Sequence, residues 1–178
     1  LEFLLTSLSF SFGIASVPMI GMAIGGGNVA RARRIAWTAG SISFLAVGAI
    51  ACIIAVFPDL WVNIFTRDGS VLVASRQYLS TAAPCYAFIG LASSMYFSSQ
   101  GAARMIGPVL AQTARLIFIA LGGFWLSSYG ATAQNFFLLA AASMVVLGTL
   151  SCLSVILTRW GPKRATVAVR PALSVVGK

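Results

Sequence analysis

Five long apolar runs, none containing an acidic side chain, dominate this sequence of 178 residues. The runs cover 3–24, 35–57, 71–100, 108–127 and 135–158, and each is long enough to cross a hydrocarbon core of about 30 Å as an α-helix. Only 8% of the residues are charged, against roughly 25% in a soluble domain, so most of the surface must face lipid. We therefore predict an all-α integral membrane protein with five transmembrane helices in 1–158, followed by a basic, disordered cytoplasmic tail over 159–178.

The ionisable residues exclude most kinds of enzyme. The chain has no histidine, and its only acidic residues, Glu2, Asp59 and Asp68, lie at the ends of apolar runs. Metal centres built from histidines and carboxylates, paired-carboxylate catalysis and Ser-His-Asp triads are therefore excluded. We expect no catalytic residue, no metal site and no cofactor. The net charge of +9 does not predict nucleic-acid binding, because the basic residues form short clusters between apolar runs.

These basic clusters predict the orientation in the membrane. Arg31, Arg33 and Arg34 lie in the first connection, Arg104 lies in the third, and the fourth has no charge. Because cytoplasmic connections are rich in arginine and lysine, we expect a multi-pass protein of the cell (inner or plasma) membrane with an outer start and a cytoplasmic C-terminus. An odd number of crossings from an outer start, without a signal peptide, further predicts that helices precede Leu1 in a longer protein.

Two segments between the runs have distinct predictions. In 59–68, Leu60, Trp61, Ile64 and Phe65 would lie opposite Asp59, Asn63 and Arg67, which is typical of an interfacial helix. Pro84 lies inside the third run and predicts a kink, because the ring leaves one helical carbonyl without its partner.

The polar residues inside the runs are the candidates for function. Five residues of the third run recur at helical spacing just beyond Pro84: Tyr86, Gly90, Ser93, Phe97 and Gln100. They would line a substrate path or, as a commoner use of small residues, form a seam between helices. Arg115 is the arginine within the fourth run; it would either serve the substrate path or extend to the headgroups.

Three motifs in order resemble loops of the multidrug and toxic compound extrusion (MATE) family. GGGNVARARR at 25–34 resembles the family's glycine–Asn–x–x–x–Ala–Arg loop between two core helices. IFTRDGSVLVASRQYL at 64–79 resembles the segment that leads into a later helix, and Pro84 follows at the family's interval. QGAARMIGP at 100–108 resembles the family's Q-G-A-G-R-x-x-x-P loop, with Ala103 where a second glycine is usual.

The resemblance implies a two-lobe transporter of twelve helices, of which this chain would supply the last five. Such a protein exports small organic, often cationic, compounds while H⁺ or Na⁺ flows in. Some members have an ion-coupling Asp in the helix that corresponds to 71–100, where this chain has no acid. We therefore expect the ion ligands in the N-terminal lobe, outside this segment. The expected partners are an organic substrate, the lipid bilayer and that lobe.

Two other functions stay open at the level of sequence. A related branch of the superfamily flips lipid-linked oligosaccharides, a substrate that favours several buried Arg or Lys, and only Arg115 would contribute from these runs. The third hypothesis is a truncated membrane protein that does not transport.

Overall fold

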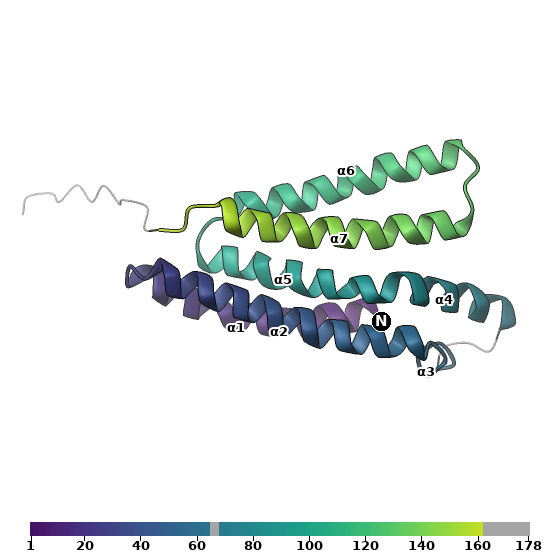
Figure 1. Ribbon diagram of the computed structural model, residues 1–178, viewed down its shortest axis with the longest axis horizontal. Coiled ribbons are helices and arrows are strands. Elements are labelled where there is room, and N and C mark those ends of the chain that lie inside the picture. The colour runs from purple at the N-terminus through teal and green to yellow at the C-terminus, as the bar shows by residue number, and fades with distance from the viewer. Residues whose placement is uncertain (65–67, 162–178) are drawn as a thin grey trace, which may run out of the picture.

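The computed structural model describes residues 1–64 and 68–161, which form helices and short connections with no strand among them (Figure 1). Helices α1 (Glu2–Gly25), α2 (Val29–Val56), α6 (Ile106–Ser128) and α7 (Ala133–Leu157) are each long and apolar enough to cross a membrane. Phe65, Arg67 and the tail from 162 onward lie outside the described residues. The all-helical membrane class is thus confirmed with four candidate spans.

The third apolar run is divided at Pro84. Helix α4 (Gly69–Ala82) is followed by the short 3₁₀ turn η1 (Ala83–Cys85) and then by α5 (Tyr86–Gly101). With 16 residues, α5 is about 24 Å long, which is less than the roughly 30 Å of a hydrocarbon core. A fifth crossing therefore requires the last turns of α4 as well as α5, and it stays a prediction.

Helix α5 lies at the centre of the bundle. Helices α1 and α2 pack on one side of it, α7 packs on the other side, and α6 packs mainly on the outer side of α7 (Figure 1). Helix α3 (Asp59–Val62) is one turn between α2 and α4, and an ion pair of 2.6 Å from Arg76 to Asp59 joins it to α4. The predicted interfacial helix is thus helical only over 59–62 among the residues described there.

Local signals set the ends of two helices. The chain leaves α1 through Gly27, which has a φ of +76°, and the Asn28 side chain then accepts a hydrogen bond from the Arg31 backbone N–H at 2.9 Å. Asp68 begins α4 by accepting hydrogen bonds from the side chain and the backbone N–H of Ser70. These bonds hold the pKa of Asp68 below its ordinary value.

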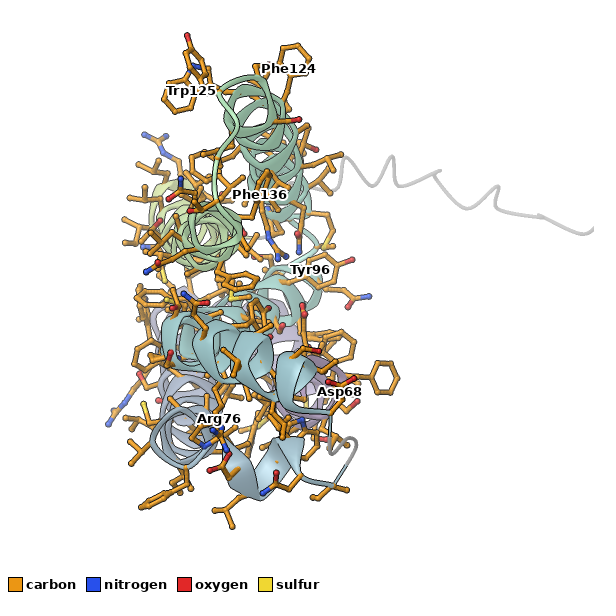
Figure 2. All side chains as sticks on the ribbon, turned by 90° about the vertical axis from the view of Figure 1, so that its right-hand side faces the viewer. Asp68, Arg76, Tyr96, Phe124, Trp125 and Phe136 are labelled. Atoms are coloured by element: carbon orange, nitrogen blue, oxygen red, sulfur yellow. The ribbon has the colours of Figure 1, made fainter. Side chains whose placement is uncertain are left out.

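The arginine-bearing connections gather at one end of the bundle. Arg33 at the start of α2 donates a hydrogen bond of 2.9 Å to the Thr158 carbonyl at the end of α7. The negative end of the α7 helix dipole stabilises a cation at this place. Trp160, inside the segment predicted as tail, is buried against a core cluster that includes Ile20 and Met95. Asp68 and Arg76 lie at the other end, which faces the viewer in Figure 2.

The turn between α5 and α6 contains a strained residue. Ala103 has a φ of +52°, a region in which a Cβ approaches the following carbonyl oxygen. We expect Ala103→Gly to raise the free energy of unfolding by about 0.5–1 kcal/mol, measured by thermal unfolding in detergent. The adjacent Ala102 has a φ of −84° and is buried, so Ala102→Gly is the control and should destabilise the protein. Equal destabilisation by both changes would contradict the strain at Ala103.

Candidate substrate path

A hollow of about 620 Å³ lies beside the break at Pro84. Its walls come from the first turn of α1, from α3 and α4, from the start of α5 and from α7. The lining residues are Leu1, Glu2, Trp61, Val62, Val71, Ala74, Ser75, Tyr78, Leu79, Tyr86 and Phe137. This volume falls within the range of small-molecule sites.

Aromatic rings and one carboxylate give this hollow its chemical character. The Tyr78 and Tyr86 hydroxyls are 3.1 Å apart, and the Phe137 ring meets Tyr78 edge to face with centroids 5.3 Å apart. Glu2 is the charged residue of the lining. Aromatic faces attract cations, and a carboxylate adds a full negative charge. The hollow therefore suits an organic cation that has apolar parts.

A buried hydroxyl cluster joins the three central helices next to the hollow. The hydroxyls of Ser9 on α1 and Ser43 on α2 lie 2.9 Å apart, and each approaches the Gly90 carbonyl of α5, at 3.0 and 2.9 Å. Both serines are fully buried. A Cβ on Gly90 would lie 2.9 Å from the Ser43 carbonyl oxygen. Only glycine allows this approach without displacing α2.

The remaining predicted residues of α5 follow one stripe from the hollow to the arginine-bearing end. Ser93 is partly buried and Gln100 is exposed. The Phe97 ring meets Phe10 edge to face at 5.1 Å and occupies the space over Gly13. Tyr86 thus lines the hollow, whereas Gly90 and Phe97 lie in contacts between helices. The structure does not gather the five residues around one cavity.

Arg115 lies on α6, away from this stripe. It is nine residues beyond Ile106, the first residue of α6, which places it about 14 Å along the helix. The residue is partly buried, and its Nε has no hydrogen-bond partner among the described residues. Its depth along α6 and its unpaired Nε fit a role in the substrate path as well as an extension to the headgroups, so both predictions for Arg115 stay open.

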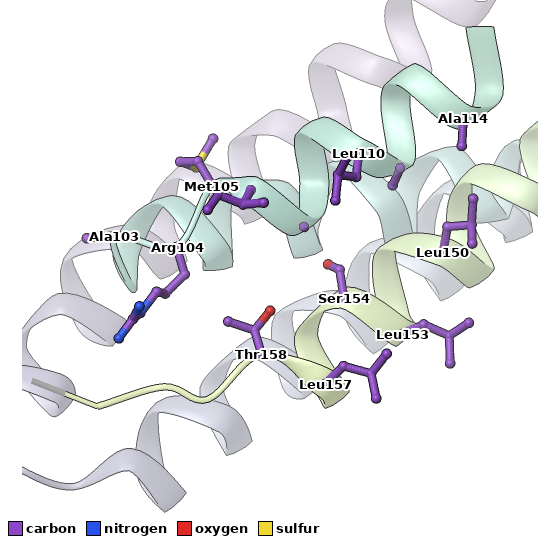
Figure 3. A pocket seen from close by; sticks show the side chains of 13 residues that line it. Ala103, Arg104, Met105, Leu110, Ala114, Leu150, Leu153, Ser154, Leu157 and Thr158 are labelled. Atoms are coloured by element: carbon purple, nitrogen blue, oxygen red, sulfur yellow. The ribbon is translucent and has the colours of Figure 1, made fainter. Parts of the chain in front are cut away.

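A second hollow, of about 720 Å³, lies at the arginine-bearing end between α6 and α7 (Figure 3). Arg104 and Thr158 stand at its edge, and leucines such as Leu110 and Leu153 line the rest. This hollow is mainly apolar and has one cation at the end of the bundle. Such a surface suits contact with lipid tails and headgroups.

Sequence reasoning did not identify Glu2, Tyr78 and Phe137 as lining residues. They come from three different helices, so no periodicity within one run relates them. It also did not identify the contact of Ser9 and Ser43 with Gly90. The available signal for this contact was the presence of hydroxyl residues on two neighbouring apolar runs, because buried hydroxyls form hydrogen bonds in folded proteins.

Comparison with known proteins gives one match. A family profile described as MatE matches residues 1–126, which extends from α1 nearly to the end of α6. No curated protein and no solved structure matches the chain.

The close approach at Gly90 yields a stability prediction. We expect Gly90→Ala to lower the free energy of unfolding by about 1–3 kcal/mol, because the new methyl group meets the Ser43 carbonyl and Val47. Thermal unfolding in detergent measures it. The control is Gly123→Ala on α6, where a Cβ meets nothing within 4 Å and where better helix propensity adds at most about 1 kcal/mol. A Gly90→Ala protein as stable as the wild type would refute the tight contact.

Proposed function

Because this chain belongs to the MatE family, whose members are transporters, we propose that it forms part of a secondary antiporter that exports organic cations in exchange for H⁺ or Na⁺. The observation that carries the cationic substrate class is the lining of the hollow beside Pro84. Rings of Tyr78, Tyr86 and Phe137 surround it, and Glu2 supplies its charge. Among residues 1–64 and 68–161, no arginine or lysine lines this hollow.

We propose that the coupling ion binds outside this chain. Its three carboxylates are Glu2, in the first turn of α1, Asp59 and Asp68, and no acid lies deeper in α1, α2, α5, α6 or α7. A buried carboxylate is the usual group that binds Na⁺ or exchanges a proton in a membrane. We propose that an N-terminal lobe supplies it and that substrate crosses between the two lobes. Such sites lie at the interface of transporter repeats.

We propose that Pro84 serves as the hinge. The 3₁₀ turn Ala83–Cys85 separates α4 from α5, and Tyr86, the first residue of α5, lines the hollow. A rotation of α4 relative to α5 at this break would change the distance between Tyr78 and Tyr86. This rotation would open or close the hollow, while the contacts that α5 makes with α1 and α2 at Gly90 would stay fixed.

The substrate class is tested at Glu2. We expect Glu2→Gln to reduce export of a lipophilic organic cation several-fold, because the hollow loses its negative charge, and to leave an uncharged substrate less affected. Dye efflux measures it, at matched expression of the protein in which the N-terminal lobe precedes this chain, in cells without their own pumps. Asp68→Asn is the control, because it removes a carboxylate from the same end outside the lining, and the asparagine oxygen can still accept the hydrogen bonds from Ser70. An equal loss of organic-cation export in both variants would show that Glu2 acts only through the surface charge of this end.

The orientation is a second prediction. We propose that the arginine-bearing end faces the cytoplasm, because positive connections stay on that side. Single cysteines at Asn28 and Ala103 in a cysteine-free protein should resist an impermeant thiol reagent added to intact cells, while a cysteine at Asn63 should react. Labelling of the Asn28 position from outside would reverse the topology.

Lipid-linked oligosaccharide flipping is the second candidate, and Arg115 is the observation in its favour. Its unpaired Nε would suit a phosphate oxygen. Arg115→Gln separates the two functions. Under our proposal organic-cation efflux persists in this variant, whereas a flippase would lose most of its translocation of a labelled lipid-linked oligosaccharide in vesicles.

A further inference from the structure

We propose that the groove between α1 and α2 at the arginine-bearing end binds one anionic phospholipid. The groove has a volume of about 820 Å³, and Arg31 and Arg34 stand at its end. Helix walls that include Phe12, Met19 and Ile42 extend it along the bundle. This site is independent of the exported substrate, because it requires only that the chain lies in a membrane.

Within the part of the chain that the structure describes, no acidic side chain lies near the two arginines. Glu2 lies in the first turn of α1, Asp59 and Asp68 flank α3 and α4, and all three are at the opposite end of the bundle. Arg33, between the two arginines in sequence, is already bound to carbonyls at the end of α7. Arg31 and Arg34 are exposed and three residues apart on one face of α2, so both reach the same ligand.

The charge pattern identifies the ligand as an anion. Two guanidinium groups bind phosphate oxygens through planar pairs of N–H donors. The start of α2 adds the positive end of a helix dipole to the same place. The charged side chains after 161 are all basic and would be repelled by these arginines: Lys163, Arg164, Arg170 and Lys178.

The rest of the groove matches a lipid tail. On α2 the lining extends from Asn28 to Ile42, which is about 21 Å along the axis and exceeds one leaflet's share, about 15 Å, of the hydrocarbon core. The floor consists of Ser16, which is buried, and Ala39, which is partly buried, whereas Met19 and Ile42 are about half exposed. A headgroup phosphate at the arginines would therefore place its acyl chain along this floor.

Lipid retention tests the proposal directly. The purified protein is exchanged into mixed micelles of phosphatidylglycerol and phosphatidylcholine, and bound lipids are counted by native mass spectrometry. We expect the wild-type protein to retain one phosphatidylglycerol in preference to phosphatidylcholine. Arg31→Gln with Arg34→Gln should weaken this preference by roughly 30-fold, since each basic residue near an anionic headgroup contributes about 1 kcal/mol.

Matched variants separate a site from diffuse attraction. Arg104→Gln with Arg159→Gln removes the same charge from the same end but not from the groove, and should leave the preference intact. Ala39→Phe keeps both arginines and fills the floor, so it should also release the lipid, and it decides the question if the double variant does not fold. Added inorganic phosphate should not displace the lipid. Unchanged retention in the groove variants, equal loss in the control, or displacement by phosphate alone would overturn the proposal.

Discussion

The packing of α5 against α1 and α2 is the contact on which the rest of the structure depends. In lipid no hydrophobic effect drives helices together, so close backbone approach and hydrogen bonds between helices have to stabilise the bundle. Gly90 lets α2 approach while its carbonyl is the acceptor for Ser9 and Ser43. Gly101, the last residue of α5, allows a similar close approach to α1, because a Cβ there would lie 2.7 Å from the Val17 carbonyl oxygen. The α6–α7 pair joins this unit mainly through α7.

The ends of the bundle differ in charge, and this difference organises what each end can bind. Among the described residues, the arginine-bearing end has no acidic side chain, and one hollow there contains Arg31 and Arg34 while another contains Arg104. The opposite end has all three carboxylates and the aromatic hollow. Figure 2 shows Phe124 and Trp125 extending outward from α6 at that end, as aromatic residues do at a membrane interface. Anionic lipid thus fits one end and an organic cation fits the other.

The helices were predictable from the sequence, but their contacts were not. Apolar length predicted five spans, of which four are confirmed as candidate spans, and Pro84 identified the break. The second run was predicted to begin at Ile35, whereas α2 begins at Val29, because hydropathy detects the part in lipid and the arginine-bearing first turns are helical outside it. The site required tertiary information, since Glu2 and Phe137 line the same hollow as Tyr86 only once the rotations of three helices are fixed. The MatE match confirmed the resemblance seen in three loop motifs.

Transport by reconstituted protein tests the central claim, that this chain is the substrate-binding part of a transporter whose coupling carboxylate lies elsewhere. The protein in which an N-terminal lobe precedes residues 1–178, and residues 1–178 alone, are placed in vesicles with an imposed Na⁺ or pH gradient. The account predicts gradient-driven movement of an organic cation by the joined protein and none by the chain alone. Gradient-driven movement by 1–178 alone would contradict the account, and no movement by the joined protein would instead favour a truncated, non-transporting membrane protein.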